Sequence, residues 1–453
     1  MLPVEHKVGS NGKAPMTALK KRLASSSNWV FALYAGAAAF STYFCMYAFR
    51  KPFAAGTYAD LQFFGTEIEL KTAFALSQLI GYTLSKYLGV KINSERVGDG
   101  RARLLLQLIL AALGALLLFA ILPTQWKWIA IFCNGLPLGM VWGVVVSFLE
   151  GRRTSDVLMA GLCCSFILAS GVVKDVGKWL MSAHGVPEFW MPFTTGALFF
   201  PGFLFSVWLL TQLPAPTAQD IAERSKRSAM DSKARWAFFR QFAGGLVLLL
   251  LAYTALSAFR EFRDVYQADM FKELYANSGV DWESKKALFT RSEMTVAFGV
   301  MAAMAALYAI KDNRLGFFAA MGMMAFGFAL IGLSTWALEQ SYVEGMGWMI
   351  GTGLGAYLAY VPFNAVLFER MMAYTRFSGT AVFAIYLADS SGYTGAVGLQ
   401  LYKDLFAGEA SRLSFFKDLC YVISLIGIVM VILSALYFAR KSTATVPEAT
   451  DLM

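Results

Sequence analysis

The pattern Tyr-x4-Ala-Phe-Arg occurs twice in the sequence, ending once at Arg50 and once at Arg260. Both copies lie near the end of a long apolar stretch, and they are 210 positions apart in a chain of 453 residues. A charged side chain in or beside a membrane helix is costly, so it usually serves function. The guanidinium of arginine is always charged, and its planar fork fits phosphate or carboxylate through two hydrogen bonds. The repeat therefore predicts a duplicated membrane protein in which an arginine from each half holds one anion.

Tyrosines and a lysine extend this predicted site. Tyr43, Tyr47 and Arg50 are spaced i, i+4, i+7, so they share one face of a helix. Tyr82 and Lys86 are spaced i, i+4 in the next apolar run, where Tyr82 could donate to the anion or orient Lys86. We expect these side chains to form a polar, cationic strip between the halves.

Each charged residue also has a simpler interpretation. Arg50 lies late in its apolar run and could anchor the helix at the membrane surface. Lys86 lies close to a helix end and could extend its amine to that surface. Arg263, one turn after Arg260, is an alternative candidate for the anion-binding arginine of the second half, but the repeat favours Arg260.

The second half carries further polar residues within apolar runs. Asp389 is either the partner of an arginine or lysine across the cavity or a carboxylate that couples transport to a proton. Tyr357, Tyr360 and Asn364 are expected to line the same space, beside a helix kink at Pro362.

A similar pattern of charges at the ends of two apolar runs, one in each half, also indicates a duplication. Glu150 is followed by Arg152, and Glu369 by Arg370. We interpret them as pairs that close the cytoplasmic side, with ordinary solvated helix ends as the alternative.

Two more charged segments have local interpretations. Lys174 and Asp175 are expected to form an ion pair with each other near the outer surface. The acidic stretch 261–293 is expected to be an exterior loop with a short surface helix.

The elements that carry these residues are expected to span a membrane. Hydrophobic residues make up 57% of the chain and charged residues 15%, against about 25% charged in soluble domains. Backbone groups inside lipid must be paired, so long apolar runs there are helices. Twelve such runs predict an all-α integral membrane protein of two pseudo-symmetric six-helix halves. Their centres are Phe40, Leu79, Ala112, Val141, Leu168, Phe200, Leu250, Val300, Gly327, Gly355, Ile385 and Ile428. The second, fifth and eleventh are the weakest, because Lys86, Lys174 and Asp389 interrupt them.

The distribution of lysine and arginine predicts the orientation, because cytoplasmic loops collect positive charge. If both termini are cytoplasmic, the inner segments hold most of the 39 Lys and Arg residues. The net charge of +9 is then a topology signal and does not indicate nucleic-acid binding. We expect a multi-pass protein of the cytoplasmic membrane that functions as a monomer. Its predicted divisions are a tail 1–28, a half 29–213, a cytoplasmic linker 214–240, a half 241–440 and a tail 441–453.

Several classes of site are not expected. The chain has two histidines, and its five cysteines all lie in apolar runs without metal-ligand spacing. Neither a nucleophile–base cluster nor a Gly-x4-Gly-Lys loop is present in the sequence. We therefore expect no cofactor, no metal and no enzymatic activity, and a gradient as the energy source.

The predicted organisation resembles the major facilitator superfamily. Within it, the run from Tyr43 to Phe53 resembles the first helix of the organophosphate:phosphate antiporters, the glycerol-3-phosphate and hexose-phosphate carriers. Those carriers have two tyrosines one turn apart before Arg-Lys-x-Phe. The resemblance implies that Arg50 binds the substrate phosphate and that Tyr43 and Tyr47 line the pore.

Two other motifs carry the same resemblance. Tyr82-x3-Lys86 is similar to a motif of that family whose lysine faces the cavity, and Arg260 falls where the family has its second phosphate-binding arginine. The chain departs from the family in lacking a histidine in its fifth helix, where Ser165–Ala169 stand.

These observations favour a secondary transporter of a small organic anion that works by alternating access, with an organophosphate exchanged for inorganic phosphate. One alternative keeps the fold but moves a carboxylate or sugar together with a proton through Asp389. Another, of a different class, is a membrane receptor that keeps the binding site and signals to a partner.

Overall fold

The computed structural model describes residues 17–95, 100–149, 155–214, 232–276, 287–375, 381–407 and 410–444. These residues are almost entirely helical, and within them one isolated bridge pairs Gln62 with Glu69. The structure confirms the all-α prediction.

In the described part of the chain, twelve long helical spans follow one another, and each contains one of the expected centres. The first half consists of α2 (Asn28–Tyr47), α3 (Leu70–Glu95), α4 (Gly100–Ile121), α5 (Lys127–Leu149), α6 (Ser155–His184) and α7 (Met191–Thr211). The second consists of α9 (Ser232–Ala276), α10 (Leu288–Ala309), α11 (Asn313–Glu339), α12 (Gly345–Pro362) continued by α13 (Phe368–Thr375), α14 (Ala381–Phe406) and α15 (Arg412–Ala444).

Short helical pieces mark the breaks between these spans. They are α1 (Ala18–Ala24), the 3-10 turns η1 (Pro52–Ala55) and η2 (Thr124–Trp126), and the π-helical η4 (Phe363–Leu367). The π segment begins directly after Pro362, where the sequence predicts a kink, because proline cannot donate the usual backbone hydrogen bond.

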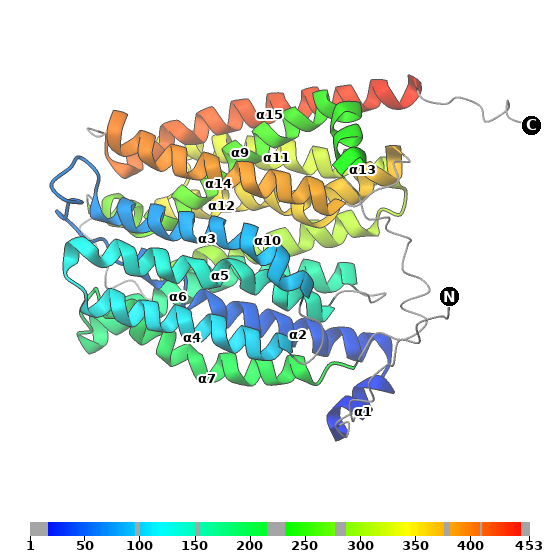
Figure 1. Ribbon diagram of the computed structural model, residues 1–453. Coiled ribbons are helices and arrows are strands. Elements are labelled where there is room, and N and C mark those ends of the chain that lie inside the picture. Colours follow the sequence, from blue (N-terminus) through cyan, green and yellow to red (C-terminus); the bar gives the residue numbers. More distant parts are fainter. Residues whose placement is uncertain are drawn as a thin grey trace, which may run out of the picture.

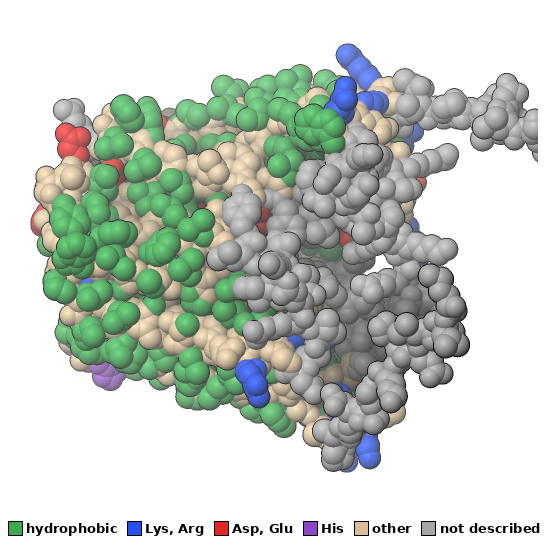
Figure 2. Space-filling model, viewed as in Figure 1, with side chains coloured by type: hydrophobic (Ala, Val, Ile, Leu, Met, Phe, Trp, Pro, Cys, Tyr) green, Lys and Arg blue, Asp and Glu red, His purple; other side chains and the backbone are tan. Residues whose placement is uncertain are grey.

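The surface of the bundle fits a membrane. Within the described residues, nine helices are long and apolar enough to cross a bilayer. The remaining spans, α3, α6 and α14, are the three that carry Lys86, Lys174 and Asp389. In Figure 2, apolar side chains are spread widely over the described part of the flank, and few charged side chains lie among them.

Exposed tryptophans gather at both ends of the bundle, as expected at the two membrane–water interfaces. Trp29, Trp208 and Trp236 lie at the end of the bundle that also holds α1 and the end of α15 (Figure 1), here called the terminal end. The far end, where α2 connects to α3, has Trp126, Trp179, Trp190 and Trp336.

The helix α9 differs from the sequence predictions at both of its ends. Residues 261–276 are not an exterior loop, since they continue α9 inside the bundle, with Glu261 and Asp264 about as buried as the apolar residues around them. Lysines of the other half pair with both carboxylates, which allows them to be buried. The same helix begins at Ser232, so the last residues of the expected linker 214–240 are helical; 215–231 lie outside the described residues.

The two halves meet mainly along α6 against α10 and α3 against α14. Backbones approach closely where Gly171 of α6 faces α10: a Cβ there would lie 2.7 Å from the carbonyl oxygen of Phe289. This contact lies toward the far end and brings the polar residues of both halves within reach of one another.

Candidate functional site

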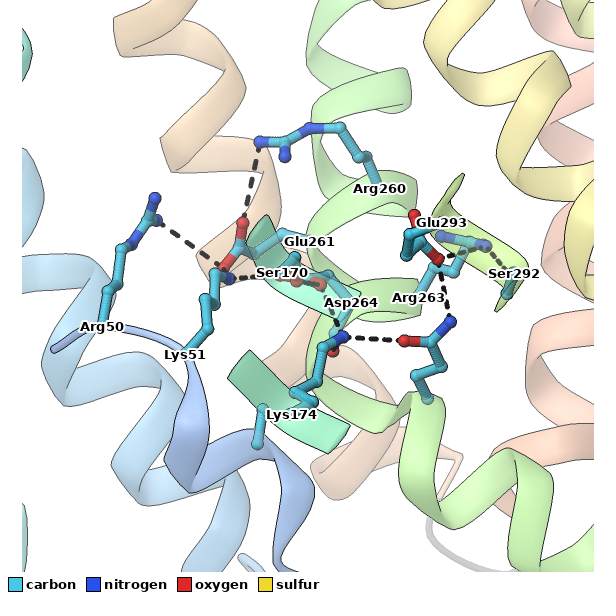
Figure 3. A network of polar contacts seen from close by, with 12 residues as sticks. Arg50, Lys51, Ser170, Lys174, Arg260, Glu261, Arg263, Asp264, Ser292 and Glu293 are labelled. Atoms are coloured by element: carbon cyan, nitrogen blue, oxygen red, sulfur yellow. Dashed lines mark hydrogen bonds and ion pairs between the residues drawn. The ribbon is translucent and has the colours of Figure 1, made fainter. Parts of the chain in front are cut away.

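The two repeat arginines lie on opposite sides of the interface between the halves. Arg50 follows the end of α2, in the turn that Pro52 enforces, and Arg260 lies within α9. Their guanidinium groups approach the same carboxylate, that of Glu261 (Figure 3). An Nη of Arg50 is 3.9 Å from one oxygen of Glu261, and an Nη of Arg260 is 3.7 Å from the other. Both arginines are buried, with 4% and 9% exposure.

Aromatic rings support both guanidinium groups, but hydrogen bonds do not. Arg50 stacks over Tyr82 at 4.1 Å from the ring centroid, and Arg260 over Tyr360 at 4.5 Å. The Nε atom of each is buried without a partner, and neither guanidinium donates a hydrogen bond to another residue of the described chain. A buried cation that lacks hydrogen bonds is costly, so these donors are suited to a ligand.

A lysine and a glutamate at equivalent positions of the repeat join the two halves. Lys51 follows Arg50, and Glu261 follows Arg260; the Nζ of Lys51 lies 2.8 Å from the carboxylate of Glu261. Lys51 also lies 2.5 Å from Asp264 and is 1% exposed. Sequence reasoning missed this pair, although the residue after each repeat arginine carried opposite charge in the two copies.

Lys174 joins the same group from α6. Its Nζ donates to Asp264 at 2.8 Å and to Gln267 at 2.7 Å, both in the second half, while Ser170 also donates to Asp264. The expected pair with Asp175 does not form, because Asp175 instead accepts from the backbone at the start of α10. We call Lys51, Lys174, Glu261 and Asp264 the far-end ion cluster.

Arg263, the rival of Arg260, is engaged within its own half. It donates to Glu293 at 2.9 Å and to the backbone oxygen of Met349 at 2.8 Å. Glu293 also accepts from Gln267. Arg263 therefore ties α9 to α10 and α12, and it is Arg260 that faces the other half.

More contacts between the halves lie beyond the cluster, toward the far end. Lys71 lies 2.5 Å from Asp269, and Thr72 hydrogen-bonds Tyr266 at 2.6 Å. Arg412 pairs with Glu69 at 2.9 Å and donates to Thr72 as well. The far end is thus closed by several layers of polar contacts.

A second charged pair crosses the interface on the terminal side of the arginines. Lys86 lies 2.6 Å from Asp389, which also accepts from the hydroxyl of Tyr253 at 2.6 Å. Asn364 donates to that hydroxyl at 3.3 Å. Asp389 therefore pairs with a lysine of the other half and ties α14 to α3.

Tyr82 is the spacer between this pair and the arginines. Its ring lies under Arg50, and the Nζ of Lys86 is 5.5 Å from the same ring. The position of Tyr82 is fixed by α5, since Gly139 approaches so closely that a Cβ there would be 2.5 Å from the carbonyl oxygen of Tyr82. The site therefore rests on tight packing between α3 and α5.

The other predicted tyrosines surround the arginines at greater distance. Tyr47 has its ring 5.9 Å from the guanidinium of Arg50, and Tyr43 packs edge-on against Tyr47 and Trp142. Tyr357 is buried and packs against Phe166 of the other half.

A small cavity lies between Arg260 and Glu261 on one side and Asp389 on the other. Its lining comes from three helices of the second half: Tyr253, Ser257, Arg260, Glu261, Tyr360, Asp389, Gly392, Tyr393 and Ala396. The free space is about 10 Å³, which holds roughly one water molecule. This cavity by itself is too small for an organic anion.

The predicted terminal-end charges are only partly visible. Glu150 and Arg152 lie outside the described residues. Glu369 is exposed, and Arg370 donates to the backbone oxygen of Ile310 at 2.7 Å and to Asn313 at 3.2 Å. In this conformation Arg370 serves the connection between α10 and α11 in its own half.

Comparison with known proteins assigns the chain to a sequence family. A family model described as a family of unknown function (DUF5690) matches residues 52–441. The chain belongs to this family. The matched segment contains Arg260, Glu261, Lys86 and Asp389, and it begins two residues after Arg50. No curated protein matches the sequence.

Solved structures show the fold. Two crystal structures of the nucleoside transporter NupG, one of them of a point mutant, align with TM-scores of 0.58 and 0.57. Each is 11% identical, and each alignment covers 90% of this chain and 98% or 99% of the other. At this identity the likeness concerns the fold alone, which is the major facilitator type.

Proposed function

We propose that the protein is a secondary transporter of a small organic anion. One arginine from each half binds the anion, and the site between them opens alternately to the two sides of the membrane. The observation that carries this proposal is the pair Arg50 and Arg260: two buried guanidinium groups from opposite halves that face one carboxylate and lack hydrogen bonds. An anion between them would receive several charge-assisted hydrogen bonds at once.

The charge of the surrounding network favours a dianion. The labelled side chains of Figure 3 include five cations and three carboxylates: Arg50, Lys51, Lys174, Arg260, Arg263, Glu261, Asp264 and Glu293. Within this group of eight side chains, two positive charges are therefore unmatched. Uncompensated charge is expensive in a dry interior, so a dianion stabilises this closed arrangement more than a monoanion does.

The same balance supports exchange over one-way transport. An empty carrier would have to pass through the closed conformation with two unmatched charges, whereas a loaded carrier would not. Inorganic phosphate is partly dianionic near pH 7 because its second pKa lies close to that pH. A phosphorylated metabolite exchanged for phosphate, as the resemblance of the first helix implies, fits this requirement.

Ligand-induced thermal stabilisation of the purified protein tests the substrate class, because selective binding to the folded state raises apparent stability. Phosphate and a phosphorylated sugar or polyol should stabilise the protein and compete with each other, while the unphosphorylated sugar should do neither. Stabilisation by neutral sugars alone would remove the anion proposal and leave the fold intact.

Substituting Asp389 by asparagine separates exchange from proton coupling. Since Asp389 pairs with Lys86 and Tyr253, Asp389→Asn should weaken binding or folding and leave uptake without any new dependence on a pH gradient. The double variant Lys86→Gln/Asp389→Asn, which removes the pair as a unit, should fold better than the single one. Loss of pH-driven uptake with intact substrate-for-substrate exchange would instead identify Asp389 as a proton carrier.

We also propose that the terminal end is cytoplasmic, which places both termini inside and the far end outside. The predicted excess of lysine and arginine at the terminal end supports this orientation. A thiol reagent that cannot cross membranes should then label a cysteine introduced at the exposed Asp60 only from outside. Labelling of that position only from inside would reverse the orientation.

A further inference from the structure

The carboxylate of Glu261 lies where a substrate anion would have to bind. Its two oxygens each face one of the repeat arginines, at 3.9 Å from Arg50 and 3.7 Å from Arg260. Both distances are too long for hydrogen bonds, and the oxygen that faces Arg260 is buried without a hydrogen-bond partner. Glu261 therefore stabilises both cations electrostatically without satisfying their donors.

The only hydrogen bond that Glu261 makes within the described chain goes elsewhere. Its other oxygen accepts from Lys51 at 2.8 Å, on the side away from Arg260 (Figure 3). Lys51 can hold this carboxylate whether or not the arginines do, because the ammonium group has three donors and also contacts Asp264. The carboxylate thus has a second cation ready when an incoming anion competes for the arginines.

We propose that Glu261 is a tethered counter-ion, which occupies the anion site in the absence of substrate and is displaced toward Lys51 when the substrate binds. This inference rests on the proposed function, because it takes Arg50 and Arg260 as the groups that bind the substrate anion. It adds that the free carrier is held in a state that weak anions do not load, so Glu261 selects for dianions.

Glu261 and Asp264 carry the same charge, but they differ in position. Asp264 is equally buried and also contacts Lys51, but its other partners are Lys174 and Ser170, and it contacts neither repeat arginine. The two carboxylates therefore form a matched comparison: removing either one adds the same net charge to the network, and only one of them lies between the arginines.

Phosphate binding to the purified full-length protein tests the proposal. Glu261→Gln should bind inorganic phosphate at least about tenfold more tightly than the unmodified protein, because a negative charge close to both guanidinium groups is removed. Asp264→Asn should change the affinity about threefold or less. Equal tightening in both variants would show a general effect of net charge, and unchanged or weaker binding in Glu261→Gln would also overturn the proposal.

A second variant guards against misfolding and against charge effects. Lys51→Gln/Glu261→Gln removes both partners of this ion pair, which proteins tolerate better than the loss of one partner, and it leaves the net charge unchanged. Asp264 loses Lys51 in this variant but keeps Lys174 and Ser170. It should still bind phosphate more tightly than the unmodified protein; weaker binding would contradict the tethered counter-ion. Failure of the proposed function gives a different result: no variant would bind phosphate, and Arg50→Gln and Arg260→Gln would behave like the unmodified protein.

Discussion

Arg50→Lys should abolish anion binding nearly as completely as Arg50→Ala, and Arg260→Lys should behave in the same way. Lysine keeps the charge but loses the planar fork and the stacking over Tyr82 or Tyr360. Each arginine supplies one side of the site, so losing one should cost about 3–5 kcal/mol of binding, which is roughly a 150- to 4,000-fold loss of affinity. Isothermal titration with phosphate on the purified variants measures the loss.

The matched control is Arg370→Lys, which changes an arginine that binds backbone oxygens at the connection between α10 and α11. Its affinity should stay within about twofold of the unmodified protein, because surface substitutions away from a site have small effects. Near-normal affinity in both Arg50→Lys and Arg260→Lys would make these residues structural anchors.

Lys174→Met should open the far end. The ammonium group of Lys174 is fully buried and donates to Asp264 and Gln267 of the other half. Its loss removes one of the two cations that pair with Asp264 and leaves the side-chain oxygen of Gln267 without its donor. Breaking a buried ion pair costs about 3–5 kcal/mol, and this cost falls only on the conformation in which the halves touch at the far end. The population should therefore shift toward the open conformation. A cysteine introduced at the buried Thr72 should react with an impermeant thiol reagent at least about tenfold faster in this background.

Lys127→Met is the control for a general loss of stability. Lys127 is also buried, but it donates to the backbone oxygens of Phe119 and Ala120 in its own half. This variant should lower thermal stability without changing the labelling rate at Thr72→Cys. If both variants accelerate labelling equally, the far-end ion cluster does not set the conformation.

The helices could be predicted from the sequence because lipid imposes a simple length and polarity rule on each span. The rule is weakest where charges interrupt a span, as Lys86, Lys174 and Asp389 do in α3, α6 and α14. The same rule misplaced residues 261–276. The acidic residues there looked exposed, but apolar residues recur at helical spacing among them, namely Phe262, Val265, Tyr266, Met270 and Phe271.

The site could be predicted in part, because the repeat marks its two arginines. The sequence does not show which residues of the two halves contact each other. The partner of Lys51 is 210 residues away, and the partners of Lys174 are about ninety residues away, so no local spacing reveals them. The repeat itself held the missing signal: under pseudo-twofold symmetry, equivalent positions face each other, and Lys51 and Glu261 are equivalent positions of opposite charge.

Exchange of phosphate across a membrane tests the central claim most directly. Proteoliposomes that contain the purified protein and are loaded with unlabelled phosphate should transiently accumulate labelled phosphate from outside, and Arg260→Lys should accumulate none. Protein-free liposomes and liposomes without internal phosphate give the background. An unmodified protein that accumulates no more label than this background, although phosphate binds to it, would contradict an exchanger that loads anions between Arg50 and Arg260.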